Sequence, residues 1–143
     1  MKKKLLVLVI VAMAIVAGQV HAQVMYDANQ VTLGWDAVTK LSNGSTIPAS
    51  DTVKYQVYTK PNSISAGQKV GAEITATQLL ISFSAEGSYF LGVESLRYQG
   101  TTLISKGPTI SWSDTASVCK DGIAFGVNYW LTIMSPGGLR RLP

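Results

Sequence analysis

The sequence feature that most constrains the fold is a period-two alternation of apolar and polar residues in short segments. Val31, Leu33 and Trp35 alternate with polar or small residues, and the same period recurs at 53–58, 78–83 and 89–95. Successive side chains of a β-strand point to opposite faces, so this alternation gives each strand one apolar face. We therefore predict an all-β fold whose strands each bury one side.

Turn-forming stretches rich in Gly, Asn, Ser and Pro separate these segments. Weaker segments of the same kind lie at 70–75 and 109–112, which brings the expected number to about seven short strands. No stretch after residue 22 has a helical period. Strands at this spacing are typical of an antiparallel β-sandwich.

The first 22 residues have the three parts of a secretion signal. A cationic start at 2–4 precedes an apolar run at 5–17, and Val20-His21-Ala22 gives a small-x-small cleavage site. The alternative is an uncleaved anchor, but the apolar run is shorter than the roughly 20 residues that span a bilayer. We expect a signal helix at 1–22, cleavage after Ala22 and a secreted or periplasmic protein. It would meet the membrane only through this segment before cleavage.

Loss of this segment changes the charge of the chain. Three of the twelve Lys and Arg residues lie in 1–22 and all eight Asp and Glu residues lie after it, so the remaining formal net charge is +1. The other basic residues are scattered singly, apart from Arg140 and Arg141. This pattern does not favour nucleic-acid binding.

The residues needed for most catalytic and metal sites are missing from 23–143. The sole histidine, His21, lies in the signal segment, and Cys119 is the sole cysteine. Imidazole bases, histidine-bearing zinc sites and intrachain disulfides are therefore not expected, nor is a cofactor. We expect a protein that is not an enzyme. Cys119 is either a small buried hydrophobe or the site of an intermolecular disulfide.

Paired carboxylates and calcium loops are the remaining routes to a catalytic or metal site. We expect the carboxylates to be solvated on loops and outer strand faces, and the aspartate spacing of a calcium loop is absent. These acidic residues are Asp36, Asp51, Glu73, Glu86 and Glu94.

Four features together resemble a bacterial fibronectin type III domain over roughly 24–114. They are Trp35 in VTLGWDAV, Asn43-Gly44 ahead of VKYQVY, the tyrosines of VKYQVY, and the spacing from Phe83 to Tyr89. The family usually has Leu-x-Pro-x-x-x-Tyr at this last place, where the tyrosine hydroxyl bonds back to the backbone. Here phenylalanine and alanine replace leucine and proline, and the first strand is thin.

The resemblance implies an immunoglobulin-like β-sandwich at 23–114. The alternation and the resemblance assign two sets of aromatic residues. We expect a structural core that includes Trp35, Tyr55, Phe83 and Tyr89. Outer faces and loops carry a second set, which is either a contact surface or simply aromatic residues favoured in strands: Tyr58, Phe90, Tyr98 and Trp130.

The sequence continues beyond this span as a C-terminal extension at 115–143. Apolar residues alternate with others from Ile123 to Ile133, which predicts a strand of about eleven residues before a Pro- and Gly-containing tail. An apolar strand of this kind has to be paired. It either folds back beside the thin first strand of its own chain, or it pairs with another chain, with self-association through 121–134.

These observations leave three functions open. The first is an exported, non-catalytic binding or adhesion module that contacts a protein or a glycan. The second is a structural or assembly subunit whose C-terminal strand pairs between chains. The third is an accessory domain of an extracellular polysaccharide-degrading system, which rests on the family resemblance alone.

Overall fold

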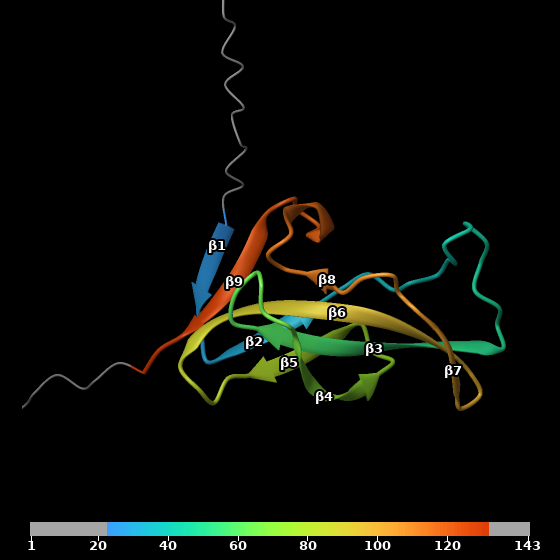
Figure 1. The fold of residues 1–143 in the computed structure, drawn as a ribbon, viewed down its shortest axis with the longest axis horizontal. Helices are drawn as coiled ribbons and strands as arrows, with labels where there is room; N and C mark the ends of the chain where they lie inside the picture. The colour runs from blue at the N-terminus through green and yellow to red at the C-terminus, as the bar shows by residue number, and fades with distance from the viewer. Residues whose placement is uncertain (1–22, 132–143) are drawn as a thin grey trace, which may run out of the picture.

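The computed structural model describes residues 23–131, which form nine β-strands and one turn of 3₁₀-helix (Figure 1). Within this span there is no α-helix, and no helix is long and apolar enough to cross a membrane. The expected signal helix and the tail from Thr132 onward lie outside the described residues. The elements are β1 (Gln23–Asp27), β2 (Gln30–Gly34), β3 (Asp51–Lys60), β4 (Gln68–Ile74), β5 (Gln78–Ser82), β6 (Gly87–Gln99), β7 (Thr102–Lys106), β8 (Ser111–Trp112), η1 (Ala116–Val118) and β9 (Ala124–Tyr129).

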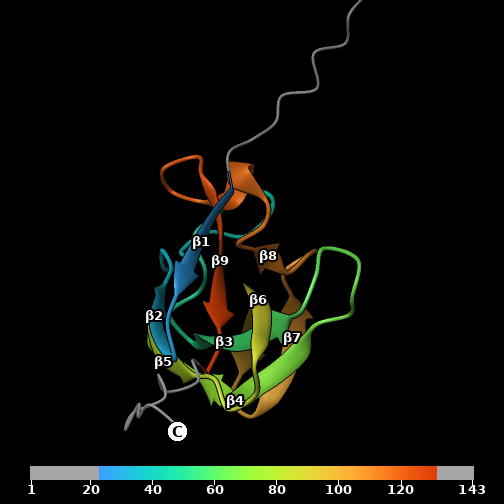
Figure 2. The ribbon, with the colours of Figure 1, turned by 90° about the vertical axis from the view of Figure 1, so that its left-hand side faces the viewer.

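The strands form two sheets, which confirms the all-β prediction. The large sheet has the order β1-β9-β6-β3-β4, with β7 and β8 also paired to β6, and the small sheet contains β2 and β5 (Figure 2). All pairs are antiparallel except β1 with β9, which is parallel. The expectation of a wholly antiparallel fold is wrong for that pair. No hairpin joins these two strands, so chain direction does not force them to be antiparallel.

Three short strands follow one another along the same side of the long strand β6. β7 pairs with 96–99, β8 with 92–93 and β9 with 87–89. Pro108, which has no N–H, lies between β7 and β8, and an excursion at 114–123 separates β8 from β9. The backbone N–H of Phe125 donates to the carbonyl of Ser113 at 2.7 Å and closes that excursion. β7 was not expected from the sequence.

The core lies between the two sheets. Leu33, Val57, Ile81, Leu91 and Val127 form one cluster, with one member each from β2, β3, β5, β6 and β9. Burying an aliphatic side chain of this size contributes about 1.5–3 kcal/mol. The small sheet is therefore packed on the inner face of the large one.

Of the four aromatic residues expected in the core, two pack against this cluster, the other two contact those, and one of the four is buried. Tyr55 is buried, its hydroxyl accepts a hydrogen bond from the Val38 N–H at 2.9 Å, and its ring meets Trp35 edge-on at 5.4 Å. Trp35 and Phe83 are partly buried against the cluster. Tyr89 is half-buried, stacks on Phe83 at 4.6 Å, and donates its hydroxyl to the Ala85 carbonyl at 2.6 Å.

The C-terminal strand differs from the expectation in length. β9 covers six residues and ends at Tyr129, whereas a strand over 123–133 was predicted. β9 lies between β1 and β6 of its own chain, which is the fold-back alternative. Residues 124–129 thus belong to the same sheet as β6, although the expected boundary fell after residue 114.

Candidate functional site

The expected contact surface is mostly covered. Tyr58 does lie on the outer face of the large sheet, opposite Gly92, but it is only 8% exposed. The ring of Trp112 lies 6.4 Å from that of Tyr58, and a Cβ added to Gly92 would lie 2.6 Å from the Trp112 ring. Tyr58 is therefore not an accessible contact residue. The alternation identified its face correctly, but it could not show that Trp112 covers it.

Tyr58 and Tyr98 each hydrogen-bond to a carboxylate on this outer face. Tyr58 donates to Glu94 Oε2 at 2.8 Å, and burial followed by this hydrogen bond raises the pKa of Tyr58 to about 12. Tyr98 is half-buried and donates to Glu73 Oε2 at 2.7 Å, which raises its pKa as well. Lys54 lies over the Tyr98 ring at 4.5 Å. Both hydroxyls are therefore already engaged within the chain.

The two remaining contact candidates differ from each other. Phe90 is half-buried and packs beside Gly126, where an added Cβ would lie 2.8 Å from its ring and 2.7 Å from Met25 Sδ. Trp130, which follows β9, is 60% exposed. Of the four expected contact residues, Trp130 alone presents a large exposed surface.

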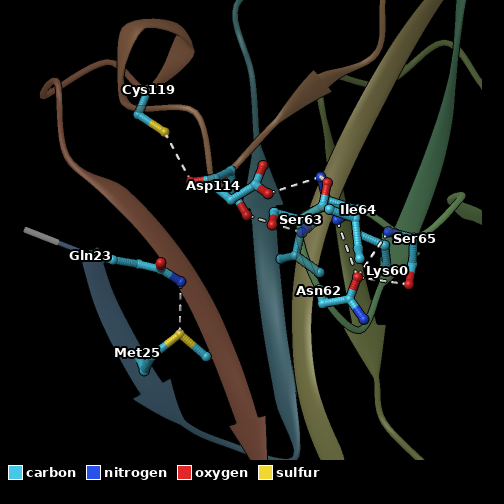
Figure 3. Close-up of polar contacts among 11 residues, drawn as sticks. Gln23, Met25, Lys60, Asn62, Ser63, Ile64, Ser65, Asp114 and Cys119 are labelled. Carbon is cyan, nitrogen blue, oxygen red and sulfur yellow. Dashed lines mark hydrogen bonds and ion pairs between the residues drawn. The ribbon is translucent and has the colours of Figure 1, made fainter. Parts of the chain in front are cut away.

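A buried ion pair ties the excursion at 114–123 to the end of β3 (Figure 3). Lys60 is 5% exposed, and its Nζ lies 2.9 Å from Asp114 Oδ2 and 4.3 Å from the centroid of the Trp112 ring. Lys60 also donates to the Ser63 carbonyl at 3.3 Å. In the next turn, Asn62 Oδ1 accepts hydrogen bonds from the backbone of Ile64 and from both donors of Ser65. These contacts order the two loops against each other.

A large concave site lies on the opposite, inner side of the large sheet. This cavity of about 870 Å³ is within the size range of ligand sites. We call it the edge groove. It runs between the end of the small sheet and the strands β6, β8 and β9, under the excursion. Its walls are formed by residues 33–36, 77–78, Leu91, Val93, 111–113, 118–121 and Phe125.

The groove reaches the last residues of β2, Leu33 and Gly34, and the backbone of β2 is unpaired on the side away from β5. Two backbone hydrogen bonds show which residues of β2 and β5 face each other as hydrogen-bonded pairs: the Phe83 N–H donates to the Asn29 carbonyl, and the Trp35 N–H donates to the Thr77 carbonyl. Hydrogen-bonded pairs alternate along an antiparallel ladder. Gln30, Thr32 and Gly34 therefore direct their N–H and C=O groups away from β5. In the described chain no strand other than β5 pairs with β2.

The edge groove combines an apolar floor with a polar rim. Leu33, Leu91 and Phe125 line the floor, and the rim carries Asp36, Lys120 and Asp121. The buried indole Nε1 of Trp35, also a lining residue, has no hydrogen-bond partner among the described residues. An unused donor of this kind is costly to bury.

Cys119 is half-buried in the wall of the groove. Its thiol lies 3.5 Å from the Ser113 carbonyl and 3.6 Å from the Thr115 carbonyl. Burial, followed by the charges of Asp121 and Asp114, raises the pKa of this thiol. The thiol is therefore protonated near neutral pH and is a poor nucleophile.

The acidic and sulfur-bearing side chains of the described residues do not form a metal site. Residues 23–131 contain no cluster of three or more His, Cys, Asp or Glu side chains that could hold a metal ion.

No protein-family model matches the chain, and no curated protein or solved structure is significantly similar to it. The edge groove was not expected from the sequence, because the free edge of β2 arises from the pairing of β1 with the distant β9.

Proposed function

We propose that this protein is an exported, non-catalytic binding module with an immunoglobulin-like, fibronectin type III-like β-sandwich. Its ligand is an extended segment of a partner protein, which adds as a strand to the outer edge of β2. The observation that carries this proposal is the unpaired backbone edge of β2 beside the apolar edge groove.

Two features support the class of fold. The small sheet packs face to face on the large one through a shared core, as in a sandwich. The hydroxyl of Tyr89 donates a hydrogen bond to the backbone carbonyl of Ala85, four residues earlier, which is the contact that a tyrosine corner makes.

The signal-like segment at 1–22 supports export to the periplasm or the exterior.

The chemistry of the edge groove favours an extended peptide as the ligand. A strand beside β2 would satisfy the outward backbone groups of Gln30, Thr32 and Gly34, and alternate side chains would enter the apolar floor. The sequence of β2, QVTLG, has no charged residue or proline to block such pairing. By contrast, β9 is already paired on both sides, which favours the binding module over an assembly subunit that pairs through this strand.

Selection of peptides from a random display library tests this proposal. Thr32→Pro removes an N–H that faces away from β5, so the β2-β5 ladder keeps its bonds while the outer edge loses a donor. Thr32→Val is the matched control, because it changes the same side chain and keeps the N–H. Leu80→Pro makes the equivalent change at the outer edge of β5, and Leu80 does not line the edge groove.

We expect the unaltered protein to enrich peptides with period-two apolar residues. Their affinity should fall at least about tenfold for Thr32→Pro and change little for Thr32→Val and Leu80→Pro. Circular dichroism verifies that each variant is folded. Enrichment of no peptide, or equal binding to Thr32→Pro, would overturn the proposal.

A further inference from the structure

A second cavity, of about 660 Å³, lies between the large sheet and the loop that joins β2 to β3. We call it the basic pocket. One wall is the loop between β2 and β3, the second is the end of β7 with the bend that follows it, and β3 and β6 form its base. It is lined by Val38, 40–43, Ile47, Val53, 95–97 and 105–108.

The charge of the basic pocket is of one sign. Lys40, Arg97 and Lys106 line it, and none of the eight Asp and Glu residues does. Arg97 is engaged by Asp51, to which its Nε donates at 2.6 Å and its Nη2 makes a second ionic contact. Lys40 and Lys106 are exposed and make no ion pair among the described residues. The pocket therefore presents two free ammonium groups to a ligand.

Internal hydrogen bonds hold the loop wall in place. Leu41 donates its N–H to the Ser45 carbonyl at 2.8 Å, and Ile47 donates to the Thr39 carbonyl at 3.1 Å. Gly44 has a φ of 83°, a left-handed conformation that glycine adopts without strain, and it closes the turn. The opposite wall is tied to β6, because the N–H of Gly107 donates to the Ser95 carbonyl at 2.8 Å. A pocket whose walls are fixed before binding loses less entropy when it is filled.

We propose that the basic pocket binds a carboxylate-bearing oligosaccharide. Lys40 and Lys106 bind the carboxylate, the hydroxyls of Ser42 and Ser105 bind sugar hydroxyls, and Pro108 lies against the C–H face of a ring. Positive charge and hydroxyl-bearing side chains in one pocket suit such a ligand, and the volume of the pocket suits one of a few sugar units. This site is separate from the edge groove, so its test is independent of peptide binding.

Isothermal titration of the full chain with trigalacturonate tests the proposal. The neutral maltotriose tests whether the carboxylate is needed, and citrate tests whether an anion alone suffices. The variant Lys40→Gln with Lys106→Gln removes both free charges of the pocket. Lys54→Gln with Lys69→Gln is the matched control, because it removes the same charge from positions outside both the basic pocket and the edge groove.

We expect saturable binding of trigalacturonate that weakens as salt is added, since both lysines are exposed to solvent. The pocket variant should lose at least about tenfold in affinity, and the control variant should stay within about twofold of the unaltered protein. The proposal is wrong if trigalacturonate does not bind saturably, if maltotriose binds equally well, or if both double variants weaken binding equally. Citrate that binds as tightly as trigalacturonate would show a simple anion site and would also overturn it.

Discussion

At the scale of single residues, Tyr58 shows how burial gives an outward-facing side chain a structural role. Its face of β3 points away from the core, yet Trp112 covers it and Glu94 accepts its hydroxyl proton in a hydrogen bond. Its pKa rises from 10.0 to about 12, first through burial and then through the Glu94 hydrogen bond. The folded protein therefore holds the phenol proton more tightly than the unfolded chain does.

This shift predicts a loss of stability at alkaline pH. Because the folded pKa is the higher one, the contribution of Tyr58 is complete below about pH 10 and disappears as the pH rises through about 12. Tyr58→Phe removes the hydrogen bond, so its free energy of unfolding near neutral pH should be lower by roughly 1 kcal/mol. Across that pH window, its free energy of unfolding should fall less steeply than that of the unaltered protein. Urea unfolding at a series of pH values measures both effects. Tyr26 is exposed, so Tyr26→Phe is the control. If its stability fell with pH as little as that of Tyr58→Phe, this interpretation would be contradicted.

At the scale of elements, local pattern predicted several strands, whereas pairings between distant segments were either left open, as for the C-terminal strand, or not predicted. Period two identified β3, β5 and the greater part of β6, because each strand buries one face. The parallel pairing of β1 with β9 joins segments almost a hundred residues apart, which no local pattern encodes. The edge groove and the cover over Tyr58 both follow from such long-range contacts. For the same reason, the sequence indicated outer strand faces as candidate contact surfaces but did not predict the edge groove.

The parallel pair can be tested by coupling across it. The register places Met25 opposite Gly126, and a Cβ added to Gly126 would lie 2.7 Å from Met25 Sδ. Gly126→Ala should therefore cost about 1–3 kcal/mol by crowding. Met25→Ala removes the nearest obstacle, so the double variant should recover part of that loss, and a double-mutant cycle from urea unfolding measures the coupling. Simple additivity of the two changes would show that β1 does not lie beside β9 in solution.

At the scale of the whole molecule, the last strand, β9, completes the large sheet and joins the first strand to it. β9 connects β1 to the rest of the large sheet, and its Val127 is completely buried in the shared core. Without β9, β1 would have no partner, and the start of β6 would lose its neighbour. Residues 124–129 therefore belong to the folded unit, and we expect folding to depend on them.

Two truncations test this view. Removal of 118–143 deletes β9, so we expect the cooperative thermal transition and the near-ultraviolet circular dichroism signal to be lost. Removal of 132–143 leaves every described strand in place and should keep a transition close to that of the unaltered protein. An assembly subunit joined through this strand would behave differently, because light scattering would show an oligomer becoming a folded monomer when 118–143 is removed. A folded product of that first truncation would mean that the core closes without Val127 and that β9 is available to a partner.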